Sequence, residues 1–381
     1  MLVIKNGTVL DPLNHINTVT DVAVDGGNIV KVGPCETAPK DNVIDAKGCY
    51  VLPGLIDHHC HLAPFAKIGL ASEAVCFASG VTTAVDAGST GCSNFPERRN
   101  FKTMTRLGIY NYINVCSTGL DSLPVQMEDV DPAHFDEAGI KACFAQYKDE
   151  LVGLKLRTSK AIVKELGYEP LKKMVEMADR LNLSVMVHCT DPPAGLDELL
   201  DVLRPGDVIT HIYMNKGPNL IGEDGKVIKA AWRAKERGVL FEAADARAHF
   251  GMPVAQAAIA QGFLPDILAT DITKLSMHLR PTAFNLAMQL AKYEALGIPF
   301  EKLVELCTVN PARQMGILDK AGSLTVGHPA DVAVLRPVEM ENVFGDRPNG
   351  DPDQHLLTGH KVYQPVLTLK KGEMVYRDVT F

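Results

Sequence analysis

The sequence lacks several features that would assign it to a membrane or to a disulfide-bonded fold. No apolar stretch is long enough to span a bilayer, because the longest candidate, 253–270, is interrupted by Gln256, Gln261 and Asp266. The nine cysteines are odd in number and never form a CxxC pair, so no disulfide framework is predicted. We therefore expect reduced thiols, a reducing compartment and no membrane partner.

Basic segments and an export signal are missing as well. The formal net charge is −8 without any basic stripe or arginine-rich run, so a nucleic-acid partner is not expected. The chain opens on a strand-like pattern and lacks the basic segment and apolar core of a secretory signal. These absences favour a cytoplasmic protein that acts on a small molecule.

The chain has enough apolar material for more than one core. It contains 381 residues, of which 46% are hydrophobic and 22% are charged, as is usual for a soluble globular protein. This length exceeds the usual size of a single core, so one large domain and one smaller domain are expected.

Strand-like and helical patterns alternate through the middle of the sequence. Helical patterns cover 66–79 and 95–106, and a broken one covers 160–181, where Gly167 and Pro170 interrupt it. Eight parallel strands separated by helices make a (β/α)₈, or TIM, barrel of the α/β class. We expect the barrel over 53–321 and one small β-sandwich formed by 1–52 and 322–381. The strand candidates lie near residues 55, 82, 113, 153, 185, 209, 240 and 268.

A histidine pair follows the first of these strands. His59 and His61 come directly after the apolar run 50–56. Residues two apart on an extended strand project from the same face, so these imidazoles can bind one metal ion, while His58 and Cys60 point the other way. The alternative is a polar strand end with a chance cluster of histidines.

Four later apolar runs also end in polar side chains that could bind a metal ion or take part in catalysis. The C-terminal ends of barrel strands meet at one mouth, so residues far apart in sequence converge there. Imidazole and carboxylate are ligands of zinc and similar metals. The residues at these four ends are Lys155, His188, His211 and Asp271.

Lys155 needs its own interpretation, because an ammonium group is not a metal ligand. Burial in a barrel wall lowers the pKa of an amine and favours its neutral form. A neutral amine can add carbon dioxide and become a carbamate, whose two oxygens can bridge two cations. Alternatively, the lysine extends to the mouth or pairs with an acid. Ligands at the other four strand ends favour the carbamate.

These residues together resemble the amidohydrolase superfamily, and in particular its binuclear metal-dependent branch of dihydroorotases and deacetylases. The segments 4–12 and 322–334 also resemble the small β-domain of that superfamily. The resemblance implies two divalent cations, zinc being expected, that activate water for attack on a carbonyl. Asp271 would be the general base and then the general acid. We assign one ion to His59, His61, Lys155 and Asp271, and the other to Lys155, His188 and His211.

Substrate contacts are expected from the loops that follow the strands. In related enzymes such positions bind a substrate carboxylate or polarise its carbonyl, although loop arginines and histidines are often only surface ion pairs. Asp271 is not closely followed by histidine, and 242–249 has no glycine-rich loop, so the sequence departs from the common pattern of its relatives. The candidate substrate-binding residues are Ser89, Arg157, Arg247, His249 and His278.

Several functions are compatible with this set of residues. The leading hypothesis is hydrolysis of an amide or ester, as in a deacetylase, on a small anionic substrate. A cyclic amidohydrolase of the dihydroorotase or hydantoinase type would use the same metal centre. A mononuclear deaminase usually lacks the strand-four lysine, and a non-catalytic barrel scaffold would have lost ligands. The sequence leaves the oligomeric state open, a homo-oligomer included.

Overall fold

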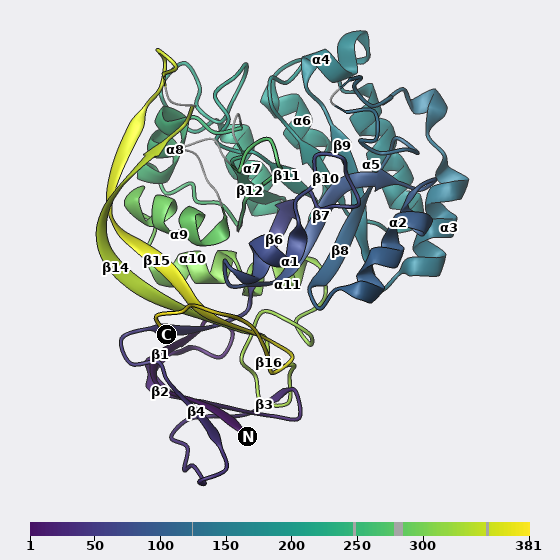
Figure 1. Ribbon diagram of the computed structural model, residues 1–381. Helices are drawn as coiled ribbons and strands as arrows, with labels where there is room; N and C mark the ends of the chain where they lie inside the picture. The colour runs from purple at the N-terminus through teal and green to yellow at the C-terminus, as the bar shows by residue number, and fades with distance from the viewer. Residues whose placement is uncertain (124, 247–248, 278–284, 348–349) are drawn as a thin grey trace.

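The structure is a computed structural model that describes residues 1–123, 125–246, 249–277, 285–347 and 350–381. Figure 1 shows a barrel of strands surrounded by helices, with a second sheet below it that contains both chain termini. Within the described ranges, no helix combines the length and the apolar character needed to cross a membrane.

Eight parallel strands form the barrel, and each follows its neighbour in chain order. The end of the first strand meets the segment just after the last strand, where Cys60 forms a parallel bridge with Ile272 and Asp271 N donates a hydrogen bond to His59 O. Every strand position expected from the sequence is occupied, which confirms the barrel. The strands are β6 (Leu55–Cys60), β7 (Val81–Gly91), β8 (Gly108–Asn114), β9 (Leu151–Arg157), β10 (Val185–His188), β11 (Val208–Thr210), β12 (Leu240–Ala244) and β13 (Ile267–Ala269).

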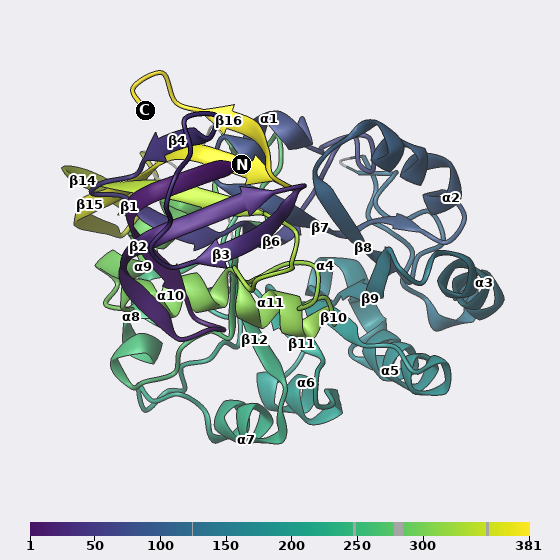
Figure 2. The ribbon, with the colours of Figure 1, turned by 90° about the horizontal axis from the view of Figure 1, so that it is seen from below.

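Helices follow the strands along the chain and cover the outside of the barrel (Figure 2). The broken pattern over 160–181 becomes a short helix, a 3₁₀ turn and the amphipathic helix α5, as expected. The described helices are α1 (Ser72–Phe77), α2 (Phe95–Arg98), α3 (Glu137–Tyr147), α4 (Lys160–Val163), α5 (Glu169–Leu181), α6 (Leu196–Val202), α7 (Lys229–Arg237), α8 (Met252–Ala260), α9 (Leu286–Ala295), α10 (Phe300–Leu306) and α11 (Val309–Gln314).

Two expected helices are shorter than their patterns. In place of 66–79, only α1 is helical, because the chain before it folds back so that Ala63 N donates to Leu70 O. A Cβ on Gly69 would lie 2.3 Å from the Leu62 carbonyl carbon, so this close approach needs glycine. The 95–106 pattern begins as α2 and continues as a 3₁₀ helix over Arg99–Met104.

Strands from both termini form one mixed sheet of eight strands. The order is β16-β15-β14-β5-β1-β2-β3, and β4 pairs with β1. Its apolar core is separate from that of the barrel and includes Ile4, Val22, Val51, Val334 and Leu367. The strands are β1 (Leu2–Asp11), β2 (Ile16–Asp25), β3 (Asn28–Val32), β4 (Asn42–Asp45), β5 (Tyr50–Pro53), β14 (Val332–Gly345), β15 (Leu356–Lys370) and β16 (Glu373–Arg377).

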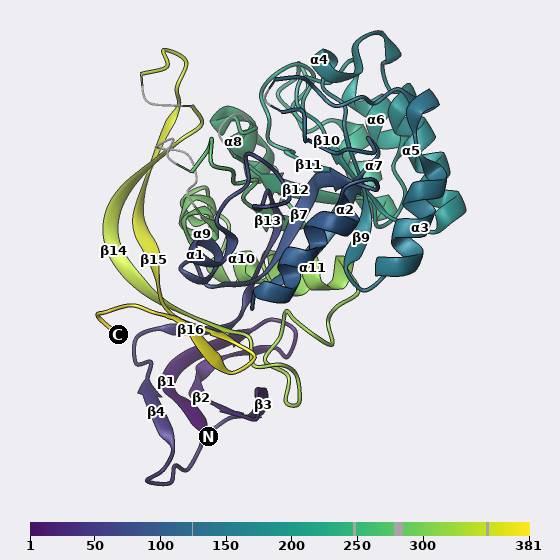
Figure 3. The ribbon, with the colours of Figure 1, turned by 45° about the vertical axis from the view of Figure 1, so that its right-hand side comes forward.

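The two sheets are joined through the apolar run 50–56, which is not one strand. It divides into β5 of the terminal sheet and β6 of the barrel, with Gly54 between them. A Cβ on Gly54 would lie 2.2 Å from Thr82 Oγ1, so only glycine allows this crossing. The β14–β15 hairpin also extends along the barrel (Figure 3), where Lys361 pairs with Glu294 of α9.

Candidate metal centre and active site

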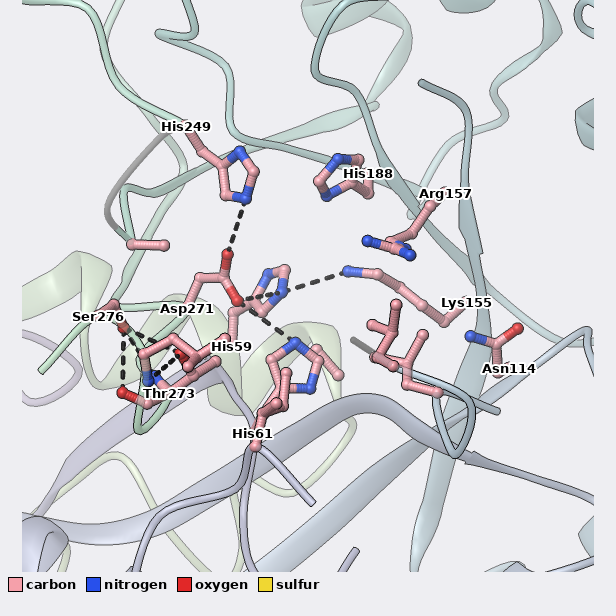
Figure 4. Close-up of a pocket in the computed structure, with 16 residues that line it drawn as sticks. His59, His61, Asn114, Lys155, Arg157, His188, His249, Asp271, Thr273 and Ser276 are labelled. Carbon is pink, nitrogen blue, oxygen red and sulfur yellow. Dashed lines mark hydrogen bonds and ion pairs between the residues drawn. The ribbon is translucent and has the colours of Figure 1, made fainter. Parts of the chain in front are cut away.

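Five of the six residues selected from the strand ends line one cavity at the mouth of the barrel (Figure 4), namely His59, His61, Lys155, His188 and Asp271. The sixth, His211, packs against His188, with ring centroids 4.5 Å apart. The cavity has a volume of about 250 Å³, which suits a small substrate. It lies above a packed apolar layer inside the barrel, to which Val85, Tyr112 and Met186 belong. The lining includes His59, His61, Ala87, Asn114, Leu120, Leu123, Lys155, Arg157, His188, His249, Asp271, Thr273, Leu275 and Ser276.

One group of possible ligands consists of His59, His61 and Asp271. Asp271 Oδ1 lies 3.5 Å from His59 Nε2 and 3.3 Å from His61 Nε2. The three ligand atoms lie within 4.8 Å of one another, which is the spacing expected of groups that share one ion.

A second group of possible ligands consists of His188, His211 and His249. Their ligand atoms also lie within 4.8 Å of one another. Among the described residues, His211 Nε2 has no hydrogen-bond partner although it is buried. A buried polar atom rarely remains unsatisfied, so a cation at this position would explain it.

Each of the five imidazoles has one ring nitrogen held by a protein oxygen. Such a contact fixes the orientation of a metal-binding histidine and directs its other nitrogen toward the ion. The contacts are His59 Nδ1 with Glu242 Oε1 (2.7 Å), His61 Nδ1 with Ser89 Oγ (2.8 Å), His188 Nε2 with Ser159 Oγ (3.2 Å), His211 Nδ1 with Ala244 O (2.6 Å) and His249 Nδ1 with Thr190 Oγ1 (3.0 Å).

Lys155 lies beside these histidines. Its side chain is only 2% exposed, and Nζ lies 3.3 Å from His59 Nε2 and 3.1 Å from Met186 Sδ. Burial lowers the pKa of Lys155 to about 8, since it outweighs the opposing effect of Glu242 and Asp271. Gly88 packs against this lysine so closely that a Cβ there would lie 2.6 Å from Lys155 Cβ.

The protonation states of the site suit metal binding, which requires neutral imidazoles and an ionised carboxylate. Burial lowers the pKa of His59 to about 4 and lowers those of His188 and His211 further below the usual value. Burial raises the pKa of Asp271, but His59, His61 and the other nearby histidines outweigh it, so this pKa lies below the usual range.

Two of the candidate ligands occupy the left-handed backbone region. The φ angles are 65° for His211, which directly follows β11, and 50° for Asp271, the second residue after β13. This conformation is uncommon for residues other than glycine and costs about 1–3 kcal/mol, so it is found mainly at functional sites.

Sequence reasoning missed a buried carboxylate beneath the site. Glu242 is fully buried, and its Oε2 lies 2.5 Å from His58 Nδ1 while its Oε1 binds His59. His58 therefore does not point away from His59 as expected, because β6 has an irregular register between Asp57 and Cys60. The sequence feature that could have revealed this carboxylate is a glutamate within the otherwise apolar run 239–244.

The candidate substrate-binding residues lie in different places. Arg157 lines the cavity and binds Glu128 through Nε (2.5 Å) and Nη2. Ser89 is buried outside the cavity lining and lies between His61 Nδ1 and Asp86 Oδ2, so its position does not fit a substrate contact. His249 belongs to the second group of possible ligands. Arg247 and His278 lie outside the described residues.

Comparison with known proteins places the chain in a family. The sequence pattern of the amidohydrolase family matches residues 50–362. The chain is 36% identical to deacetylase Atu3266 of Agrobacterium fabrum over 87% of this chain and 82% of that protein. It is 33% identical to a deacetylase of Brucella anthropi over 89% of this chain and 84% of that protein.

A solved structure agrees with these relatives. The crystal structure of a dihydroorotase superposes with a TM-score of 0.89 at 30% identity, covering 99% of this chain and 100% of that chain. The resemblance to the superfamily that the strand-end residues indicated is thereby confirmed. The chain belongs to the amidohydrolase family.

Proposed function

We propose that the protein is a metal-dependent hydrolase that removes an acyl group from a small substrate by cleaving an amide or ester bond. The observation that carries this proposal is the pair of ligand groups, His59/His61/Asp271 and His188/His211, of which all but the buried His211 line one cavity. The relatives named deacetylases favour an acyclic acyl substrate.

The donor atoms fit two divalent cations, with zinc proposed because imidazole nitrogen dominates the set. His59, His61 and Asp271 would hold one ion, and His188 with His211 would hold the other. Lys155, as a carbamate, would contribute an oxygen to each. Bound cations would supply a water of lowered pKa and polarise the substrate carbonyl.

Asp271 would move the proton. Its Oδ1 faces His59 and His61, whereas its Oδ2 lies 3.8 Å from His211 Nε2, so the carboxylate stands between the two ligand groups. One oxygen can bind a cation while the other accepts a proton from water and later delivers it to the leaving group. Because its pKa is held low, Asp271 would be ionised, as a metal ligand must be.

The cavity wall suggests the type of substrate. Leu120, Leu123 and Leu275 would exclude water and contact apolar parts of the substrate, while Arg157 and Asn114 would bind polar groups such as a carboxylate. The guanidinium of Arg157 is positioned by Glu128, whose side chain is buried. We therefore propose a small carboxylate-bearing substrate.

Ring opening of a cyclic amide is the second candidate function, and the similarity to a dihydroorotase structure favours it. A panel of N-acetyl amino acids, O-acetyl hydroxy acids and cyclic ureides, offered to the metal-loaded protein, separates the two. Faster turnover of acyclic acetyl compounds supports the proposal, whereas turnover of ureides alone supports ring opening. A metal-loaded protein that hydrolyses neither type would indicate a scaffold.

We further propose that the enzyme acts in a reducing compartment such as the cytoplasm. All nine cysteines are free and buried, and none depends on an oxidised partner.

A further inference from the structure

His249 lies in the second ligand group although it does not directly follow a strand. Its ring centroid is 4.9 Å from that of His188 and 4.3 Å from that of His211, and the centroids of His188 and His211 are 4.5 Å apart. The three rings therefore form a nearly equilateral triangle. Three imidazoles converging on one point are a known set of zinc ligands.

The orientation of His249 is set in the same way as that of the other four imidazoles. Its Nδ1 lies 3.0 Å from Thr190 Oγ1, and when Nδ1–H donates to that hydroxyl, the Nε2 lone pair faces the site. Nε2 lies 3.5 Å from Asp271 Oδ2, on the side of the carboxylate away from His61.

The described residues on both sides of His249 are firmly anchored. Asp245 accepts hydrogen bonds from Lys292 Nζ and Tyr293 OH of α9, both at 2.9 Å. His249 N donates to Asp245 O, and Gly251 N donates to Tyr213 O at 2.8 Å. These contacts hold the backbone next to the imidazole in place, which favours precise metal binding.

A second observation points to a cation at this position. His211 Nε2 is buried and, among the described residues, has no hydrogen-bond partner. It is one of the three ligand atoms of this group. We infer that His249 is the third imidazole ligand of the second cation, together with His188 and His211. This inference rests on the proposed two-ion function and assigns a ligand beyond the six residues at the strand ends.

Metal titration of the apoprotein tests the assignment directly. Zn²⁺ affinity is measured against a competing chelator, and Co²⁺ is used in parallel because its visible absorption depends on its ligands. In His249→Asn, one ion should bind as in wild type, whereas the second should bind more than about 100-fold more weakly. That loss exceeds the usual effect of residues that only orient a ligand. The cobalt absorption of the second ion should also change.

Two further variants make the test specific. Thr190→Val keeps the shape of the side chain and removes only the hydroxyl that orients His249, so the second ion should bind about 10-fold more weakly. His134→Asn is the matched control, because this exposed histidine lies outside the cavity. Its affinity for both ions should equal that of wild type.

The outcomes separate this inference from the proposed function. If wild type binds two ions and His249→Asn binds both with unchanged affinity and absorption, the inference is overturned and the proposed function stands. A raised KM with unchanged metal binding would then make His249 a substrate contact. If wild type itself fails to bind a second ion, both the inference and the two-ion function are overturned.

Discussion

Replacement of Glu242 tests whether a carboxylate beneath the site controls metal binding. Its two oxygens bind two imidazoles, His58 Nδ1 at 2.5 Å and His59 Nδ1 at 2.7 Å. Burial raises the pKa of Glu242, but the adjacent His59 and His58 lower it well below the usual value, so the group is ionised. An ionised acceptor orients His59 and makes its Nε2 a stronger ligand.

The size of the effect depends on the replacement. In Glu242→Gln, the amide oxygen can still accept a hydrogen bond from His59. The amide N–H can donate to His58 Nδ1 if the His58 ring changes tautomer. Its Nε2–H then donates to Gln314 Oε1, 3.0 Å away. Only the charge is then lost, and metal affinity should fall about 10-fold, or about 1.4 kcal/mol. Glu242→Met removes both acceptors at similar volume and should cost about 100-fold, or about 2.7 kcal/mol.

The assay is chelator competition with apoprotein, with the free energy of unfolding measured alongside. Glu150→Gln is the control, because Glu150 pairs with Arg99 and Lys102 outside the barrel mouth. This control should lower stability without changing metal affinity. The reasoning is refuted if Glu242→Met binds both ions as tightly as wild type, or if Glu150→Gln weakens binding equally.

Three further replacements address the other proposed roles. Asp271→Asn should lower kcat at least about 100-fold in metal-loaded enzyme, since proton transfer typically contributes this much, and full activity with both ions bound would contradict its role as base. The Lys155→Ala variant should contain fewer than two ions when measured by elemental analysis. If it retained both ions, Lys155 would not be a carbamate ligand. Gly88→Ala should reduce metal content because the new Cβ would lie 2.6 Å from Lys155 Cβ. Gly262→Ala is its control, because Gly262 has a φ of 81°, close to the 84° of Gly88, but a Cβ there would have no atom within 4 Å. This control should retain full metal content.

The barrel and its strand-end residues were accessible to sequence reasoning because each is encoded locally. A buried parallel strand is a short apolar run, and the next residue lies at the mouth. His188, His211 and Asp271 could therefore be placed at one mouth of the barrel without knowledge of the intervening loops. The division of 50–56 between two sheets could not be predicted from the sequence. It depends on the close contact of Gly54 with Thr82, which is distant in sequence.

Residues that orient the site are harder to predict, since their role depends on contacts between strands. Glu242 reaches His58 and His59 across the barrel, and Ser89 of β7 binds His61 from the neighbouring strand. His249 was selected as a loop residue, but only the fold shows that its ring packs against His188 and His211. The loop 66–71 has helical spacing, yet the Leu62–Leu70 bridge outweighs that local preference.

Metal content measured together with activity tests the central claim most directly. Purified protein should contain about two divalent ions per chain, lose acyl hydrolysis in parallel with their removal by a chelator, and regain it when zinc is restored. Full hydrolytic activity in protein shown by elemental analysis to be free of metal would contradict the account.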